Sequence, residues 1–472
     1  VYTKASFQHN HSSRWRKVFW LGTAPPEVEI HYDLSYWVST GLVMPYDQTV
    51  IPTEADISSH YGQWISADTD LMGNGLLSKY FPKTGGRPEI GLMPKWSAMY
   101  LLTMDNRIKD MVIGHGELAG GIPAHYKEDN PAYSFYDKPI NIDDFDYAVS
   151  GASVSLPAPI GSITTSWTVD RAHQGSFAYL PYLITGEKFF LDEAYYWSST
   201  DLAWDTYRRN GIGSMQDFSS QIGDGTSANG IIYGQMRAVA WSLRNISDAA
   251  LIAPYNSAEH NYFREKAKNN IQWLYLGNTG ANAQGLNAVR VPREHTSSDP
   301  AVEINLAPWQ HDFLVLVLTD MYRKGLYPTT NIKTVIDTLG KYTVGRFTND
   351  PVFNKWDGAG YWWPLRMTDS VGYFDEGDWN QYYNATFAYA ASNQGMPNSD
   401  YSRYNYPDSY AFIARAALAN LDNVVGYDEA YDFLSGNLTI SNLKSNPTWA
   451  IVPDLLVALG NMVLPPRALK LQ

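Results

Sequence analysis

The segment Asp170–Trp204 constrains the fold more than any other part of the chain. It reads as two helices that are separated by a tight turn at Gly186, and a glycine at such a break is typical of a helix C-terminus. Tyr, Phe and Trp crowd the body of the segment, and its first turn carries four polar side chains: Asp170, Arg171, His173 and Gln174. The sequence therefore predicts a helical hairpin with a polar cluster at one mouth.

Further helical patterns recur in pairs from about residue 94 to the end of the chain. Examples are 231–250 and 308–325, the latter with Pro at its start and Gly at its end. Long loops separate the pairs. This organisation predicts a mainly α fold, an (α/α)6-7 barrel or toroid with long decorated loops, over residues 86–472. Residues 1–85 show little helical period, so we expect an irregular or β-rich N-terminal segment that packs on the toroid.

Composition narrows the range of functions. The 472 residues include no cysteine, which removes thiol catalysis and Cys-based zinc sites and favours a location outside the cytoplasm: extracellular, periplasmic or virion-associated. The net charge of −13 argues against a nucleic-acid binder. No apolar run reaches the roughly 18 residues of a membrane span. The chain begins at Val1 rather than Met, so we expect further domains or subunits N-terminal to it.

Aromatic residues are unusually frequent. The chain has 16 Trp and 34 Tyr, and aromatic residues make up 14% of it. Such side chains serve in hydrophobic cores, but their flat faces also suit the C–H faces of sugar rings, and the polar handles of Trp and Tyr suit partly wet surfaces. The composition therefore favours contact with a carbohydrate, with a purely structural use as the alternative.

Several motifs occur in a characteristic order: TGGRPEIG, PKWSAMYLLTMD, DRAHQGSFAYLPYLITGEKFFLDEA, QMRAVAWSLRNISDAA and PWQHDFL. In this order they resemble the (α/α)-toroid carbohydrate-active proteins, which include polysaccharide lyases and several glycoside hydrolases. They also resemble uncharacterised bacterial and phage proteins in which a toroid follows a β-domain. The resemblance covers roughly residues 85–425 and implies a polysaccharide partner without naming one reaction.

One reaction that the polar cluster suits is β-elimination on a uronic acid, which needs a base, an acid and a group that neutralises the carboxylate. We assign His173 as the catalytic base, with Tyr233 or Tyr373 beside it. Substrate-binding candidates are Arg171, Gln174, Arg237, Trp241 and His125. For each residue a structural role is the alternative: a helix cap for Asp170, a hydrogen-bonded ring for His173, and a solvated helix face for Arg237, Trp241 and Arg244.

Carboxylates offer a second chemistry. A glycoside hydrolase needs two of them, about 5–5.5 Å apart for retention of configuration or about 6.5–9.5 Å apart for inversion. The candidates are Glu89, Glu303, Glu376 and Asp378, and Trp379 next to the last of these could bind a sugar ring. The acids around Asp378 could instead hold a structural Ca²⁺, and we expect no other metal or cofactor. A third possibility is a non-catalytic glycan-binding or structural protein of a cell or virion surface.

Overall fold

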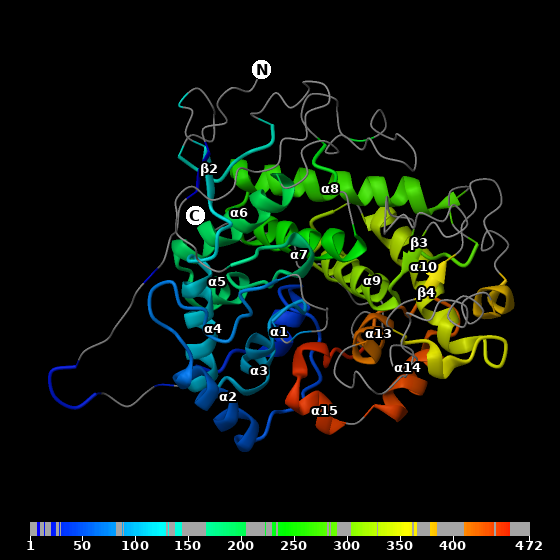
Figure 1. The fold of residues 1–472 in the computed structure, drawn as a ribbon, viewed down its shortest axis with the longest axis horizontal. Helices are drawn as coiled ribbons and strands as arrows, with labels where there is room; N and C mark the ends of the chain where they lie inside the picture. Colours follow the sequence, from blue (N-terminus) through cyan, green and yellow to red (C-terminus); the bar gives the residue numbers. More distant parts are fainter. Residues whose placement is uncertain are drawn as a thin grey trace.

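Helices make up most of the structure, a computed structural model (Figure 1). It describes most of residues 30–143, 167–203, 229–289, 304–360 and 410–453, the short pieces 7–9, 20–24, 363–365 and 378–384, and single positions at 14, 28 and 222. The expectation of a mainly α fold is confirmed, because the described strands are only three residues long.

The helices of the described part are α1 (Leu34–Ser39), α2 (Glu54–Ser66), α3 (Lys95–Thr103), α4 (Asn106–Ala119), α5 (Tyr179–Thr185), α6 (Lys188–Ala203), α7 (Met236–Ile252), α8 (Ala258–Asn278), α9 (Pro308–Arg323), α10 (Thr329–Thr348), α13 (Tyr410–Leu418), α14 (Tyr427–Asn437) and α15 (Ile440–Ser445). Short 3₁₀ turns are η1 (Arg171–His173), η5 (Lys355–Asp357) and η6 (Pro447–Trp449). Two antiparallel strand pairs join β1 (Phe7–His9) to β2 (Tyr126–Glu128) and β3 (Ile304–Leu306) to β4 (Trp363–Leu365).

The predicted helical hairpin is confirmed as α5 and α6. Gly186 ends α5 with a positive φ of 65°, and its N–H donates to the Tyr182 carbonyl at 2.7 Å. A glycine adopts this left-handed conformation without the steric cost that a Cβ would add. The polar start of the segment differs from the expectation, because it is a separate 3₁₀ turn, η1, and not the first turn of α5. Residues 174–178 connect the two.

The N-terminal segment contains more helix than its sequence pattern indicates. Helix α2 lies within residues 1–85, so the expectation of an irregular or β-rich structure is wrong for that stretch. A capping box starts the helix: the Thr53 hydroxyl accepts from the Asp56 N–H at 3.2 Å, and Asp56 Oδ2 accepts from the Thr53 N–H at 2.9 Å. Local capping thus specifies a helix that periodicity did not indicate.

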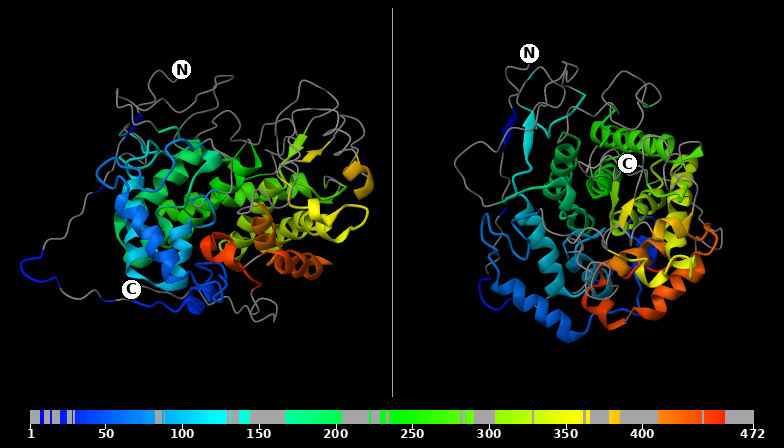
Figure 2. Two further views of the ribbon diagram at one scale, coloured as in Figure 1. Left: turned by 60° about the horizontal axis from the view of Figure 1, so that its bottom comes forward. Right: turned by 45° about the vertical axis from the view of Figure 1, so that its right-hand side comes forward.

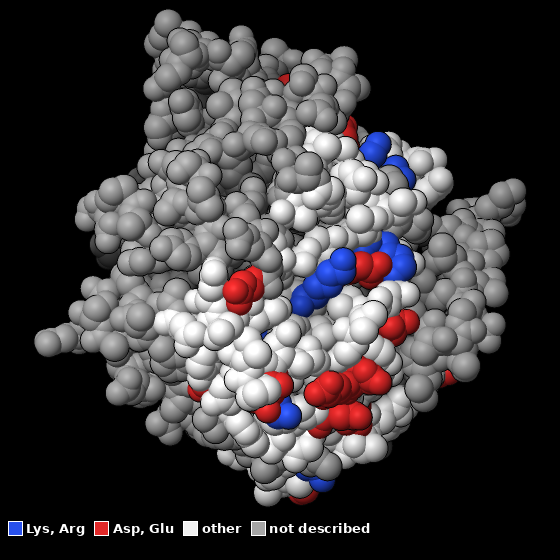
Figure 3. Space-filling view, turned by 90° about the vertical axis from the view of Figure 1, so that its right-hand side faces the viewer, with Lys and Arg blue, Asp and Glu red and all other residues white. Residues whose placement is uncertain are grey.

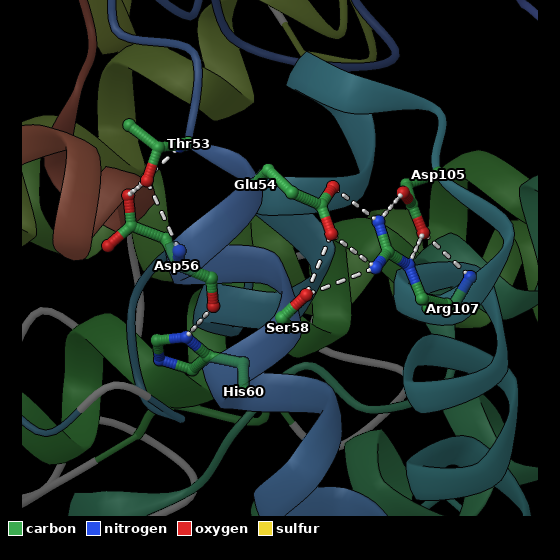
Figure 4. Close-up of polar contacts among 7 residues, drawn as sticks. All are labelled: Thr53, Glu54, Asp56, Ser58, His60, Asp105 and Arg107. Carbon is green, nitrogen blue, oxygen red and sulfur yellow. Dashed lines mark hydrogen bonds and ion pairs between the residues drawn. The ribbon is translucent and has the colours of Figure 1, made fainter.

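Replacing Thr53 by alanine should lower the free energy of unfolding by about 1 kcal/mol, because the N–H of Asp56 loses its acceptor. Figure 4 shows this capping box beside the neighbouring contacts of Glu54, Asp105 and Arg107, which tie α2 to α4. Urea denaturation at pH 7 measures the change. Thr53→Ser keeps the hydroxyl and should stay within a few tenths of a kcal/mol of wild type, and equal losses in both variants would contradict the capping role.

Successive helices pack against their neighbours in chain order. Helix α7 contacts α6, α8 and α9, while α9 contacts α10 and α13, and α13 contacts α14 and η6. The turn η6 in turn packs on α3, so the C-terminal part of the described chain lies beside the N-terminal helices (Figures 1 and 2). The backbone joins the two parts as well: the Asp47 N–H donates to the Ala450 carbonyl at 2.7 Å, and the Val452 N–H donates to the Pro45 carbonyl at 3.0 Å.

Helices α7, α9 and α13 are buried along most of their length and begin close together. In their first turns, the Arg237 N–H of α7 donates to Gln310 Oε1 of α9 at 3.3 Å, and the Trp309 ring lies 5.5 Å from the Tyr410 ring of α13. The turn η1 packs against α7. The fold therefore places the polar cluster of η1 where the first turns of two long buried helices, α7 and α9, meet.

The described surface carries mixed charge. Figure 3 shows a face on which basic and acidic side chains lie next to one another, with no continuous basic tract among its described residues. None of the described helices combines the length and the apolar character that crossing a lipid bilayer requires.

Candidate functional site

Buried His173 of η1 and half-buried Asp170, the residue that precedes this turn, form a pair. Asp170 caps this turn, since its Oδ1 accepts from the Ala172 N–H at 2.9 Å, and its Oδ2 lies 2.6 Å from His173 Nδ1. Burial alone would raise the pKa of Asp170, but the hydrogen bonds from His173 and Ala172 outweigh it and lower the pKa. Asp170 therefore caps the turn, as the structural alternative for it predicts, and also binds the imidazole.

The second ring nitrogen of His173 has no hydrogen-bond partner among the residues that the structure describes. The residue is 2% exposed, and Nε2 is buried. An ionised carboxylate only accepts hydrogen bonds, so Nδ1 carries the proton toward Asp170 and Nε2 keeps its lone pair. The ring centre of Trp241 lies 5.4 Å from that of His173. In this arrangement the imidazole is neutral, and the carboxylate of Asp170 fixes its tautomer. The other ring nitrogen, Nε2, can accept a proton.

Two arginines lie close to this pair. Arg87 Nη2 donates to the His173 carbonyl at 3.2 Å, and Arg87 Nε lies 2.8 Å from Glu89 Oε1. Half-buried Arg237 donates through Nε to Gln235 Oε1 at 2.6 Å. Burial is the largest cause that lowers the pKa of His173, and the charges of Arg237 and Arg87 lower it further, against the opposing hydrogen bond to Asp170. The site therefore keeps His173 neutral near pH 7 beside positive charge.

The first turns of α7 and α9 add to the positive potential. Their N-cap residues, Gln235 and Ala307, provide no side-chain cap, and Gln310 supplies an acceptor for one amide of α7. Unsatisfied amides give a helix N-terminus a partial positive charge that favours anions. The Trp309 indole N–H in the first turn of α9 is buried and has no hydrogen-bond partner in the described part of the chain. The surroundings of His173 thus suit an anionic group better than a cation.

Several predicted ligands are corrected by their burial. Trp241 is 1% exposed and its indole N–H donates to the Ile90 carbonyl at 2.6 Å, so its faces pack in the core and offer no stacking platform. Arg244 is also 1% exposed, which makes the expected solvated face of α7 wrong. The Gln174 amide donates to Asp201 Oδ1 at 2.5 Å and holds the backbone of η1 in place of a substrate.

His125 lies outside the cluster and has both ring nitrogens occupied. Its Nδ1 is 2.8 Å from the Ile122 carbonyl, and its Nε2 is 2.7 Å from Glu193 Oε2. The residue is 0% exposed. These contacts give it a structural role, so its prediction as a substrate ligand is corrected. His311 is also 0% exposed, and its ring nitrogens contact the Val289 N–H and the Leu339 carbonyl, which gives it a structural role as well.

The carboxylates predicted for a hydrolase lie in different parts of the structure. Glu89 is buried beside His173 in its ion pair with Arg87. Asp378 accepts from the N–H groups of Asn380 and Gln381 at 2.9 and 3.1 Å, as a residue capping a helix start does. Trp379 stacks on Tyr342 at 5.9 Å and contacts Phe353 edge-on, so one of its faces belongs to the core. Trp379 was predicted to bind a sugar ring, and these contacts leave only its other face for that role.

Four candidates, Tyr233, Glu303, Tyr373 and Glu376, lie outside the described residues. Arg171 is half-buried, and its charge acts on Asp201 in the neighbouring helix α6. The cluster that the structure brings together is therefore Asp170, Arg171, His173, Glu89 and Arg237.

Sequence reasoning missed two residues of the site. Arg87 stands two positions before Glu89, at a turn in which the Ile90 N–H donates to the Arg87 carbonyl at 3.3 Å, and opposite charges so close in the chain could have indicated the ion pair. Asp201 lies 27 residues beyond Gln174, and no local pattern connects the two. A buried contact between elements so far apart in the chain is decided by how the helices pack.

Among the residues with described positions, no group of three or more His, Asp or Glu side chains is arranged to hold a metal ion. Comparisons of the chain with family models, with curated proteins and with solved structures found no match.

Proposed function

We propose that this chain is a carbohydrate-active enzyme that cleaves an acidic polysaccharide by β-elimination, with His173 as the catalytic base. The observation that carries the proposal is the pair of buried His173 and half-buried Asp170, in which Nδ1 of the ring lies 2.6 Å from the carboxylate and Nε2 has no hydrogen-bond partner among the described residues. A neutral imidazole held in this tautomer can accept a proton at Nε2, and the Asp170 carboxylate stabilises the imidazolium that forms.

The elimination requires that the base remove the proton at C5 of a uronic acid. The electrons of that C–H bond form the C4=C5 double bond, and the C4–O bond to the next sugar breaks with a proton going to the leaving oxygen. Tyr233 and Tyr373 stay our candidates for the proton donor. Since His173 Nε2 is covered, the residues over it must move aside when the glycan binds.

The surrounding charge supports a carboxylate-bearing substrate. Removal of the C5 proton places negative charge on the uronic carboxylate, and fixed positive groups lower the energy of that state. Arg237 and the first turns of α7 and α9 can supply this charge, and Arg171 is a further candidate. Arg87 is engaged with Glu89 and His173, so we give it the role of holding the η1 backbone.

We also propose an overall arrangement for the described helices. The order of helix contacts, from α6 through α7, α9 and α13 to η6 and back to α3, is the order expected of an (α/α) toroid. We propose that the described helix pairs form such a toroid and that its mouth at η1 admits the glycan. The expected location is extracellular, periplasmic or virion-associated, where acidic polysaccharides occur, and the reaction as written uses protein side chains alone.

A hydrolase and a non-catalytic glycan binder are the alternatives. Glu89, the one predicted hydrolase carboxylate in the cluster, is neutralised by Arg87 at 2.8 Å, which disfavours its use as a nucleophile or a base. The buried ring of His173 and the partly buried side chains around it suit catalysis better than adhesion, because an adhesive surface presents its groups to solvent.

Replacing His173 by glutamine should reduce cleavage by about 100- to 10,000-fold, because the base is lost while a polar side chain of similar size remains. The measurement uses the purified chain with a panel of uronic-acid and neutral polysaccharides. Absorbance of the unsaturated product reports elimination, and a reducing-end assay reports cleavage of either kind.

His31→Gln is the matched control, since His31 is exposed and far from the cluster in sequence, and it should keep the wild-type rate. Reducing ends that form without ultraviolet absorbance would favour a hydrolase. Glycan binding without any cleavage would favour the binding or structural role. Elimination that survives in His173→Gln would refute the assignment of the base.

A further inference from the structure

A closed hydrogen-bond network of four buried residues lies next to His173. Gln174 Nε2 donates to Asp201 Oδ1 at 2.5 Å, and Asn245 Nδ2 donates to Asp201 Oδ2 at 3.2 Å. Arg244 donates to Asn245 Oδ1 at 3.0 Å and to the Gln174 carbonyl at 2.8 Å. All four side chains are at most 5% exposed. The network joins η1 to α6 and α7, three elements that are distant in the sequence.

We propose that Asp201 and Asn245 are positioning residues for His173, which they hold through Gln174. The inference rests on the proposed function of His173 as a base. Gln174 follows His173 directly in the chain, and both its side chain and its carbonyl are fixed by the network. Arg87 fixes the His173 carbonyl and Asp170 fixes the ring, so the imidazole is held from both sides.

The direction of each hydrogen bond makes this network specific. Both Asp201 oxygens accept from amide N–H groups, and Asn245 donates through its nitrogen while its oxygen accepts from Arg244. Burial raises the pKa of Asp201 to about 7, so the carboxylate is ionised at pH 8. An amide at position 201 would set an N–H group against that of Gln174 or Asn245. A buried donor without an acceptor costs about 1–3 kcal/mol.

A swap of the two residues restores every donor and acceptor. In the double variant Asp201→Asn/Asn245→Asp, the new amide oxygen at 201 accepts from Gln174, and its nitrogen donates to the new carboxylate at 245. That carboxylate also accepts from Arg244, which bonds the oxygen of residue 245 in the wild-type chain. Each single variant instead leaves two like groups facing each other, so the single variants should disturb the position of His173 and the double variant should restore it.

The first readout needs no substrate. In the full chain labelled with ¹⁵N-histidine, the Nδ1 proton of His173 that bonds Asp170 gives a low-field NMR signal, which His173→Gln identifies by its loss. At pH 8 this signal should shift or vanish in Asp201→Asn and in Asn245→Asp and return to its wild-type position in the swap. If the signal stays unchanged in folded Asp201→Asn, Asp201 does not position His173 and the proposal is wrong.

Thermal unfolding checks that each variant folds, and Gln174→Met gives a second test should Asp201→Asn fail to fold. It removes the amide link and leaves Asp201 bonded to Asn245, so it should also shift the His173 signal, and an unchanged signal would overturn the proposal.

Where elimination activity is found, the single variants should lose about 10- to 100-fold in rate, as for a base displaced by up to 1 Å, and the swap should recover to within about threefold. NMR rescue without any activity in the wild type would support the positioning role and refute the proposed reaction, so the two failures can be told apart.

Discussion

Replacing Lys324 by methionine is expected to lower the free energy of unfolding by about 3 to 5 kcal/mol, the usual cost of breaking a buried ion pair from one side. Lys324 follows α9 and is 3% exposed. Its Nζ lies 2.5 Å from Asp248 Oδ1 of α7 and 2.5 Å from Asp320 Oδ2 of α9. Without the ammonium group, two buried carboxylates would face each other with little to neutralise them.

The pKa shifts agree with this account. Burial alone would lower the pKa of Lys324, but the charges of Asp248 and Asp320 outweigh it and raise the pKa above its ordinary value. Burial raises the pKa of Asp248, and Lys324 opposes that shift. Chemical denaturation at pH 7 measures the loss for the variant.

Two further variants test the cause. Lys188→Met removes an ion pair with Asp192 at the surface, where the lysine side chain is 81% exposed, and should change the stability by less than about 0.5 kcal/mol. The triple variant Lys324→Met/Asp248→Asn/Asp320→Asn should regain part of the lost stability, because no unpaired charge remains. A triple variant less stable than Lys324→Met would show that the carboxylates are not the source of the loss.

Acid should destabilise the protein through two buried histidines. Burial is the largest cause that lowers the pKa of His115 and of His311 to about 3 each. Between these two pKa values the unfolded chain, whose histidine pKa is near 6.5, binds protons that the folded chain does not bind. The contribution of each neutral ring to the free energy of unfolding is therefore fully present above about pH 6.5, and it is lost as the pH falls toward 3. Between pH 7 and pH 5 each ring should cost about 2 kcal/mol.

The hydrogen bonds explain why the folded rings stay neutral. His115 Nδ1 faces the Met111 carbonyl at 2.7 Å, and its Nε2 accepts from the Leu76 N–H at 3.1 Å. His311 Nε2 faces the Leu339 carbonyl at 3.0 Å, and its Nδ1 accepts from the Val289 N–H. In each ring the second nitrogen is already occupied as an acceptor, so an added proton would meet a donor.

The measurement is urea denaturation of wild type and variants at pH 5 and pH 7. Asp201 acts in the opposite direction, since its raised pKa makes the folded chain gain a proton on acidification, and the total change is therefore smaller than the sum for the two rings. His115→Gln and His311→Gln should each reduce the difference between the two pH values by about 2 kcal/mol. The exposed His31→Gln should leave it unchanged, and an equal slope in all three variants would contradict the assignment.

The sequence by itself determined the local elements with strong signals. The turn at Gly186 ends α5, and Pro308 begins α9, as their residue types indicate. It also placed Asp170 and His173 together, because residues three positions apart at a helical turn are neighbours in space. The periodicity of the sequence did not indicate the start of α2, because its capping signal depends on only two residues, Thr53 and Asp56.

Only the tertiary structure decided which polar residues are buried and what they face. Trp241 and Arg244 lie on a face of α7 that its own sequence leaves open to solvent, but α9 and the segment at 89–91 cover it. Gln174 was predicted to be a substrate ligand, but its amide donates to Asp201 of the distant helix α6. Burial and hydrogen-bond partners depend on the packing of elements far apart in the chain. The same packing places His173 beside Asp170 and leaves its Nε2 without a hydrogen-bond partner among the described residues.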